Sequence, residues 1–269
     1  MENKLPISVF VVSKNEGHLL ANCLNSISPY CSETIVIDLK SADTTLLVAQ
    51  KHKAKILTIE PVPLVEIIHS RYIEIAKNNW VLICDPDEVL TSNLVMELKN
   101  IFTNQIEKLD LVGEISSPWR FYFKGKKLKG TIWGGINFRT LLIHKKRFKF
   151  TELVHQGRAL LNGYSKMTIS EDNNQHINHY WMQSYSQLIN KHNRYLKNEG
   201  RAKYESGETT NIKKIIKKPF KIFKQSYFKK EGYKDGFVGL FLSVFAAWYF
   251  TSAEMELYKY SRKSKVIKD

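Results

Sequence analysis

Residues 80–88 read WVLICDPDE, a five-residue apolar run that leads directly into three carboxylates. A short apolar run of this kind is typical of a strand buried on both faces of a sheet. Residues 7–12 and 35–37 have the same character, and the run at 35–37 ends at Asp38. Residues 56–59 complete a set of four predicted strands.

Helical patterns separate these runs. Apolar residues recur at helical spacing from Leu19 to Ile27, and residues 44–52 and 64–78 also favour helices. This alternation predicts an α/β fold with an open, mostly parallel sheet and helices on both faces. Ligands of such sheets bind beyond the carboxyl ends of the strands, which is where Asp38 and the carboxylates of residues 85–88 fall.

The pattern changes after about residue 112. Short strand-like segments at 112–117, 120–123 and 139–143 are separated by glycine-rich turns, whereas the pattern is helical from residue 184 onward. We therefore expect three regions, residues 1–112, 113–183 and 184–269.

Composition and charge narrow the function classes. The 269 residues are 43% hydrophobic, which excludes a disulfide mini-protein, a collagen-like fibre and a wholly disordered chain. The formal net charge is +15, but residues 1–90 carry 8 Lys and Arg against 11 Asp and Glu, whereas residues 191–269 carry 19 against 8. This distribution predicts a polyanionic partner for the C-terminal region, either a membrane surface or a nucleic acid. A solvated lysine-rich surface is the alternative.

Cysteine usage and hydropathy predict a cytoplasmic protein. Cys23, Cys31 and Cys84 are too scattered for a disulfide framework, and no CxxC pair offers zinc-ligand spacing. The first apolar run is too short for a signal-peptide core. The longest apolar stretch, residues 237–250, is shorter than the ~20 residues of a spanning helix. We expect a protein that attaches to a membrane without crossing it.

Asp85 and Asp87 are separated by one residue at the end of a predicted strand. Two carboxylates so placed can bind a hard divalent cation, which would neutralise a diphosphate leaving group. The alternative is an acidic turn that caps a helix. The buried strand before the pair, and Asp38 at an equivalent strand end, favour the metal.

Several of these segments resemble the family 2 glycosyltransferases, which have a GT-A fold and use nucleotide-diphosphate sugars. The resembling segments are Ser13-Lys14-Asn15-Glu16, CLNS at 23–26, IVIDLKSADTT at 35–45, Arg71 and WVLICDPDE. Later features resemble a bacterial subgroup that adds glucose or similar sugars to the lipopolysaccharide inner core. These are Ile177-x-His179-Tyr180, Lys191-x-x-Arg194-Tyr195 and Gly232-x-x-Asp235-Gly236-x-x-Gly239.

The resemblance implies roles for the three regions and for individual residues. Residues 1–112 would bind the nucleotide-sugar and residues 113–183 would bind the acceptor, whereas a membrane role for residues 184–269 depends on their basic and apolar pattern rather than on the resemblance. Ser13 and Glu16 would lie by the base and ribose, and Asp38 would accept hydrogen bonds from a uracil ring. Arg71 would contact the nucleotide or its phosphates; a surface salt bridge is the alternative for this residue.

The resemblance also implies a metal site. Asp87 would ligate Mg²⁺ or Mn²⁺ directly, and Asp85 would touch the ribose or a metal-bound water or join the ligand set. His155, His176 and His179 are candidates for a third ligand or for positioning phosphates, and we select His155. For each histidine, a hydrogen-bonded structural role is the alternative.

The sequence departs from the family pattern after the second strand. Leu39, Lys40 and Thr44 stand where the family has a serine and two glycines. Because the loss of glycine restricts positive φ, we expect a turn of different shape. Lys40 would then be available for a phosphate contact.

A second departure concerns the catalytic base. Many relatives have a His-Glu pair whose glutamate is a candidate base, whereas this chain has His155-Gln156. An inverting transfer needs a carboxylate near the acceptor hydroxyl to take its proton. The candidates are Asp172, Glu171 and Glu152, of which we favour the first two; a plain turn residue is the alternative for either.

Aromatic and basic residues suggest contacts for the acceptor and for a membrane. Trp119, Trp133 and Trp181 offer faces for sugar stacking, with ordinary core positions as the alternative. Between residues 212 and 228, Ile and Phe form one stripe opposed by lysines, which suits adsorption to anionic lipid. Pro219 is expected to kink or divide this helix. Lysines in water on helices packed against the catalytic domain are the alternative, and no nucleic-acid-binding motif accompanies them.

The sequence thus predicts a metal-dependent, inverting glycosyltransferase at the inner face of the cytoplasmic membrane. It would transfer a sugar from a UDP-linked donor to a hydroxyl of a glycan or glycolipid, such as lipopolysaccharide core. A glycosyltransferase-like binding or scaffold protein is the first alternative, because of Gln156. A basic nucleic-acid-binding protein is the second, because of net charge alone.

Overall fold

The computed structural model describes residues 4–62, 65–150 and 158–266. The chain forms two compact units, and each contains two separate segments. The first unit comprises Met1–Trp119 and Phe138–His179, and the second comprises Arg120–Asn137 and Tyr180–Asp269. The division into donor, acceptor and membrane regions stays a prediction about function.

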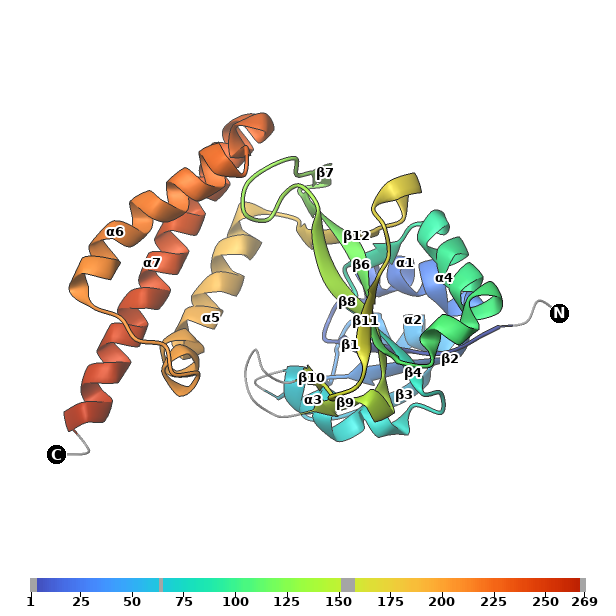
Figure 1. Cartoon of the computed structure of the whole chain (residues 1–269). Coiled ribbons are helices and arrows are strands. Elements are labelled where there is room, and N and C mark those ends of the chain that lie inside the picture. Colours follow the sequence, from blue (N-terminus) through green and yellow to red (C-terminus); the bar gives the residue numbers. More distant parts are fainter. Residues whose placement is uncertain (1–3, 63–64, 151–157, 267–269) are drawn as a thin grey trace. The chain divides into compact units, whose positions relative to one another are not determined.

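The strands are numbered in chain order (Figure 1). They are β1 (Leu5–Ser13), β2 (Cys31–Asp38), β3 (Lys55–Thr58), β4 (Trp80–Cys84), β5 (Glu88–Leu90), β6 (Val112–Phe123), β7 (Lys126–Lys127), β8 (Asn137–His144), β9 (Phe148–Phe150), β10 (Arg158–Leu160), β11 (Ser165–Thr168) and β12 (Ile177–Met182). Thus the two short segments predicted at 112–117 and 120–123 are one continuous strand, β6.

Ten strands form one sheet in the order β3-β2-β1-β4-β8-β6-β12-β5, with β7 and β11 also paired to β6. The strands β3, β2, β1 and β4 are parallel, as predicted. Strand β8 runs antiparallel to β4, and β12 runs antiparallel to β5. The α/β class is confirmed, with the parallel part of the sheet at the N-terminal strands.

Helices cover both faces of the parallel strands. They are α1 (Gly17–Ile27), α2 (Thr45–Lys51), α3 (Val65–Tyr72) and α4 (Ser92–Asn104). Successive side chains of a strand point to opposite faces. Accordingly Val9 and Val11 pack with α1, α2 and α4, whereas Phe10 packs with Ile68 of α3 on the other face. Helix α3 ends at Tyr72 and a 3₁₀ turn follows, so it is shorter than the predicted 64–78.

Short 3₁₀ turns join several of these elements. They cover Ser28–Tyr30, Ile73–Ile75, Ile106–Leu109, Lys145–Arg147 and Asp172–Asn174, the last of which is η5.

All three cysteines are buried free thiols. The Sγ atoms of Cys23, on α1, and Cys84, at the end of β4, lie 3.5 Å apart. The hydrogen bond with Cys23, together with burial, raises the pKa of the Cys84 thiol well above its ordinary value. Both side chains are part of the core, and the Cys84 thiol is neutral there.

The second unit is mostly helical. It contains α5 (Tyr185–Glu205), α6 (Ile212–Phe223), a π-helical turn η6 (Lys224–Lys229), a 3₁₀ turn η7 (Gly232–Asp235) and α7 (Gly236–Val266). Helix α7 packs against both α5 and α6 (Figure 1). Polar contacts support this packing: the Ser226 and Ser243 hydroxyls are 2.9 Å apart, and Lys218 pairs with Glu254 at 2.9 Å.

Helix α6 continues through Pro219 to Phe223, so the proline does not divide it. The irregular backbone begins five residues later, in the π-helical turn η6. The expectation that Pro219 divides this helix is therefore wrong, and the alternative, a kink, stays a prediction.

One helix of the described chain, Gly232–Lys263, is long and apolar enough to cross a membrane by length and composition. The apolar stretch at 237–250 is thus part of a longer helix than its own length indicates. In the most apolar window of this helix, 44% is buried inside the protein.

An aromatic cluster forms part of the core of the second unit. The ring of His192 contacts Trp133, Trp181, Phe245 and Tyr249 at centroid distances of 4.7–6.1 Å. Trp133 and Trp181 also pack on each other at 4.8 Å. These two tryptophans therefore have the core role that was the alternative to sugar stacking.

Candidate active site

Three of the predicted site residues lie at one edge of the sheet. Ser13, the last residue of β1, pairs with Asp38, the last residue of β2. On the other side of β1, Val11 pairs with Cys84, so that Asp85 follows at the same edge. Because parallel strands end together, their carboxyl ends bring polar residues from distant parts of the sequence to one place.

Asp38 is fully buried and its carboxylate has fixed partners. The backbone N–H of Ser41 donates to its two oxygens at 3.1 and 3.3 Å, and the Thr58 hydroxyl donates at 3.3 Å. Ser13 is also buried, but its hydroxyl has no hydrogen-bond partner among residues 4–62, 65–150 and 158–266. The edge thus combines the oriented carboxylate of Asp38 with the Ser13 hydroxyl, which is able to form a hydrogen bond with a ligand.

The loops after β1 and β2 are joined into one structure. Asn15 donates its backbone N–H to the Ser41 hydroxyl at 2.9 Å, and Gly17 donates to Asp43 at 3.0 Å. A Cβ atom at Gly17 would lie 2.5 Å from the Thr44 hydroxyl, so only glycine permits this approach. A hydrogen bond from the Thr45 hydroxyl lowers the pKa of Asp43.

Lys40 has φ +56°, the left-handed conformation that glycine adopts easily. Lys40 thus keeps positive φ without a glycine, whereas Thr44 has φ −76°, and the expected difference in turn shape stays a prediction. The Lys40 ammonium pairs with the Glu60 carboxylate, and both side chains are largely exposed.

The turn after β4 is closed by a buried carboxylate. The backbone N–H of Asp85 donates to Glu88 Oε2 at 2.9 Å, and the N–H of Glu88 donates to the Asp85 carbonyl at 3.0 Å. The Glu88 side chain is fully buried and forms an ion pair with Arg139 of β8. Arg139 also donates to the Ile83 carbonyl at 3.1 Å and lies 3.7 Å from Asp85 Oδ2.

Burial and charge act against each other at this pair. Burial raises the pKa of Glu88, although the Arg139 guanidinium opposes the rise. Burial works against the charged form of Arg139, but the Glu88 and Asp85 carboxylates outweigh it and raise the pKa of the guanidinium. Arg139 therefore stays charged and fixes the shape of the turn that carries Asp85 and Asp87.

Asp87 begins a second line of contacts. Its Oδ2 lies 3.3 Å from His179 Nε2, and the His179 ring stacks on Trp119 with centroids 4.5 Å apart and planes at 10°. The Arg139 guanidinium lies over the Trp119 ring at 5.4 Å. Strands β6, β8 and β12 thus each contribute one side chain that supports the turn after β4.

Only some of the predicted metal ligands can be placed. Asp85 has a half-exposed side chain, whereas Asp87 is 12% exposed. His155 lies outside the described residues, as do Glu152 and Gln156. Within the described part of the chain, no group of three or more His, Cys, Asp or Glu side chains is placed to hold a metal ion. His176 lies 3.1 Å from the Asn178 side chain, and among the three histidines His179 is the one beside Asp87.

Asp172 and Glu171 lie away from the residues of the turn after β4. Both are exposed at η5, where the Ser170 hydroxyl donates to Asp172 at 2.6 Å. Thr91, just before α4, donates to the Asn174 carbonyl at 2.8 Å. Because Ile177 pairs with Leu90 and His179 pairs with Glu88, η5 and His179 lie at opposite ends of the β5–β12 pair.

Glu16 and Arg71 lie at helix ends. Glu16 is the N-cap residue of α1, with no side-chain capping bond, and Arg71 is exposed in the last turn of α3.

Sequence reasoning missed Arg139, and it named Trp119 only as a sugar-stacking face. Glu88 is the last residue of the WVLICDPDE segment, but the sequence pattern did not indicate that it is buried and pairs with Arg139. Arg139 had no local signal, because its role depends on the pairing of β8 with β4.

No family model matches the chain. The chain is similar to an uncharacterized glycosyltransferase of Rickettsia bellii, with 26% identity over 247 residues, 90% of this chain and 82% of the relative. A corresponding protein of Rickettsia prowazekii is 26% identical over 259 residues, 90% of this chain and 83% of the relative. These relatives confirm the prediction of a glycosyltransferase at the level of enzyme class.

Among solved structures, the chain is similar to glucosyl-3-phosphoglycerate synthase from Mycobacterium tuberculosis in complex with Mn²⁺ and UDP-glucose. The two are 21% identical, the match covers 43% of this chain and 44% of that chain, and the TM-score is 0.35.

Proposed function

We propose that this enzyme is an inverting GT-A glycosyltransferase that moves a sugar from a UDP-linked donor to a hydroxyl of a cell-surface glycan or glycolipid. Lipopolysaccharide core is the acceptor class implied by the resemblance of the late sequence motifs. The observation that carries the proposal is the single sheet edge that contains Ser13, Asp38 and Asp85.

The donor's nucleoside is proposed to bind at Ser13 and Asp38, with Glu16 beside it. The Asp38 carboxylate is held in place by Ser41 and Thr58, so its remaining lone pairs can accept N–H bonds from a uracil ring. The unsatisfied Ser13 hydroxyl supports the same assignment, since a buried polar group gains from a ligand partner. Arg71 is proposed to contact the phosphates.

Asp85 and Asp87 are proposed to hold Mg²⁺ or Mn²⁺. Carboxylate oxygens are the donors that these hard cations prefer, so the residues present fit such an ion. His179, 3.3 Å from Asp87, would orient that carboxylate or join the ligand set, in place of the earlier candidate His155. A bound ion would neutralise charge on the departing diphosphate.

Arg139, Glu88 and Trp119 are proposed as positioning residues. Their contacts hold the turn after β4 and the His179 ring. A site held in this way keeps its groups in the productive geometry before the substrate arrives.

The acceptor hydroxyl must lose a proton as the sugar arrives. Glu152, Glu171 and Asp172 are the proposed candidates for this base. Glu171 and Asp172 are exposed carboxylates with the required chemistry. Because they lie beside the start of α4, a base at either position requires an acceptor that extends to that end of β12.

The second unit is proposed to lie on an anionic membrane at the cytoplasmic face. Ile212, Ile216 and Phe220 of α6 follow one another at four-residue spacing and are 58%, 63% and 77% exposed. Lysines flank them, an arrangement that suits an interfacial helix. The polar contacts of α7 with Lys218 and Ser226 favour its role as the central helix of this unit rather than a spanning segment.

Calorimetric titration of UDP into the full chain, with and without Mn²⁺, tests the donor site. We expect Mn²⁺-dependent binding that weakens at least about tenfold in Asp87→Asn, because a metal-site carboxylate is lost. Transfer from UDP-sugars should fall in the same variant. Asp110→Asn, an exposed aspartate before β6, is the matched control. Equal UDP affinity with and without Mn²⁺, in both the wild type and Asp87→Asn, would contradict the proposal.

A further inference from the structure

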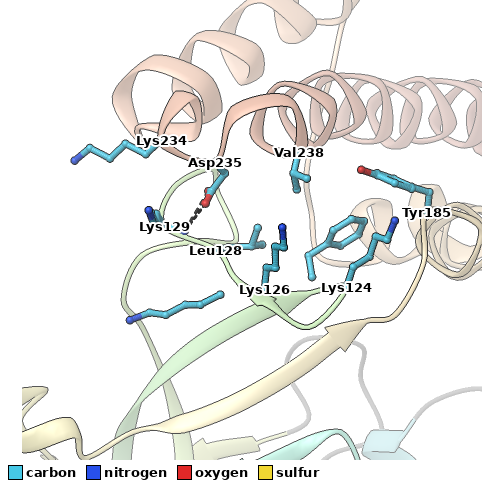
Figure 2. A pocket seen from close by; sticks show the side chains of 10 residues that line it. Lys124, Lys126, Leu128, Lys129, Tyr185, Lys234, Asp235 and Val238 are labelled. Carbon is cyan, nitrogen blue, oxygen red and sulfur yellow. Dashed lines mark hydrogen bonds between the residues drawn. The ribbon is translucent and has the colours of Figure 1, made fainter.

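A pocket lies within the second unit, at the hairpin between β6 and β7 (Figure 2). Its volume is about 440 Å³. Five lysines line it, and we call it the lysine pocket: Lys124, Lys126, Lys127, Lys129 and Lys234. Leu128, Tyr185 and Val238 give the same pocket an apolar part.

The hairpin presents its lysines through an unusual backbone. Tyr122 pairs with Lys127 and Phe123 pairs with Lys126, so Lys124 and Gly125 form the two-residue turn. Both turn residues have positive φ, +51° and +74°. Asparagine and glycine are the usual residues of such a turn, so a lysine at the first position has to adopt a strained conformation. The Lys124 ammonium lies over the Tyr185 ring at 4.8 Å.

Close backbone contacts hold the frame of the pocket. A Cβ atom at Gly130 would lie 2.2 Å from the Glu231 carbonyl oxygen, and one at Gly239 would lie 1.8 Å from the Gly232 carbonyl oxygen. The Gly232-x-x-Asp235-Gly236-x-x-Gly239 motif therefore permits the start of α7 to meet the loop after β7. The frame is set by backbone packing before any ligand binds.

Asp235, the one carboxylate of the pocket, is engaged by the backbone. Its oxygens accept the N–H of Lys129 at 2.8 and 3.1 Å and the N–H of Gly130 at 2.7 Å (Figure 2). Lys234 pairs with Glu231 at 2.6 Å and points away from the pocket. Of the carboxylates in the described chain, none lies within ion-pair distance of the ammonium groups of Lys124, Lys126, Lys127 or Lys129.

The lysine pocket thus has more lysines than carboxylates, and within the described residues its carboxylate, Asp235, bonds to backbone N–H groups rather than to the ammonium groups of the hairpin. Burial and the nearby Arg120 lower the pKa of Lys127, as expected where cations crowd together. In Figure 2 the ammonium ends of Lys124 and Lys126 are directed toward the space between the hairpin and the start of α7. An anion in this space would meet the ammonium groups of Lys124 and Lys126.

We propose that the lysine pocket binds the phosphate of a ligand that also carries an apolar part. Lysines bind phosphate as mobile point charges, and several of them together favour a multiply charged oxyanion. The apolar lining from Leu128, Tyr185 and Val238 would contact the non-phosphate part of the ligand. This site belongs to the second unit alone and does not depend on the donor edge at Ser13, Asp38 and Asp85.

Two soluble probes test the proposal on the full chain by calorimetry: inorganic phosphate, and dihexanoyl phosphatidic acid below its micelle concentration. The test variant is Lys126→Gln/Lys129→Gln. The control is Lys146→Gln/Lys149→Gln, which removes the same charge from two exposed lysines of the first unit. Thermal unfolding verifies that each variant is folded.

We expect the wild type to bind phosphatidic acid, the pocket variant to bind at least about tenfold more weakly, and the control to stay within about twofold. Tighter binding of phosphatidic acid than of phosphate would identify a lipid headgroup as the ligand, and equal binding would identify a free phosphate group. Equal losses in both double variants, or no binding of either probe by the wild type, would overturn the proposal. UDP titration of the same variants separates this result from the donor site, because UDP affinity should not change.

Discussion

The turn after β4 and the hairpin between β6 and β7 both concentrate charge, but they balance it differently. Three carboxylates fall within residues 85–88, and each lies beside a cationic or imidazole side chain: Arg139 for Asp85 and Glu88, and His179 for Asp87. Four lysines fall within residues 124–129, and no carboxylate of the described residues pairs with their ammonium groups, since the nearby Asp235 bonds to backbone N–H groups instead. The first turn carries its own counter-charge, whereas the second requires one from solvent or a ligand.

Burial explains the difference. Glu88 is fully buried, and an ionised carboxylate in that position has to be paired. The four lysines are exposed, so water screens them and no partner is required for folding. The comparison therefore teaches that a buried charge at a turn has to be paired within the protein, whereas exposed lysines need no partner for folding and stay available to an anion.

Removal of the internal counter-charge should have the largest effect on stability. In Arg139→Met the buried Glu88 carboxylate loses its cationic partner. We expect the free energy of unfolding at pH 8 to fall by about 3–5 kcal/mol. The pKa of Glu88 is raised in the folded state, so its stabilising contribution is present below the ordinary glutamate pKa and is lost as pH rises. The deficit of the variant should therefore shrink toward pH 4.5.

Urea unfolding at pH 4.5 and pH 8 measures this dependence. The control is Arg139→Met/Glu88→Gln, which removes both charges and should recover most of the lost stability with little change between the two pH values. A deficit in Arg139→Met that is the same at both pH values would show that Glu88 is not the cause.

A smaller loss of stability is expected from substitution of the glycines at the start of α7 and in the hairpin between β6 and β7. Gly239→Ala puts a Cβ atom 1.8 Å from the Gly232 carbonyl oxygen, and we expect a loss of about 2 kcal/mol although alanine favours helix formation. Gly125→Ala, in open space but with φ +74°, should cost about 1 kcal/mol. Thermal unfolding compares the two, and equal losses would mean that the close contact at Gly239 is relieved.

The smallest effect concerns the apolar residues beside the lysines of α6. Phe220→Ser removes a side chain that is 77% exposed, so folding should be unaffected. Binding to phosphatidylglycerol vesicles should weaken about tenfold, or ~1.4 kcal/mol, because the ring no longer enters the lipid. Leu47→Ser, 66% exposed on α2, is the control and should bind as the wild type does. Unchanged vesicle binding by Phe220→Ser would show that charge alone attracts this unit to lipid.

The parallel strands and their carboxyl ends could be predicted because each is a local pattern. An apolar run followed by Asp38 or by Asp85 predicts both the strand and the position where the strand ends. Arg139 and His179 could not be located in the same way, since their contacts depend on strands that pair far along the chain. The division into two units could not be predicted either, because each unit is built from two segments that are separated in the sequence.

Two residues do not follow their usual local preferences. Pro219 lies within α6, which continues past it although proline normally interrupts a helix. Lys40 adopts a positive φ that glycine takes more easily. An argument from residue preferences misses such cases, because the surrounding structure can hold a residue in a conformation that it does not prefer.

The neighbouring thiols of Cys23 and Cys84 provide a way to measure local opening of the sheet edge that contains Ser13, Asp38 and Asp85. Cys84 directly precedes Asp85, and its sulfur lies in the core against the sulfur of Cys23 on α1. Because the Cys84 thiol is buried and neutral, a thiol reagent can modify Cys84 only in molecules where β4 has separated from α1. The labelling rate of Cys84 therefore measures how often this edge of the sheet opens, and a nucleotide bound there would slow the labelling.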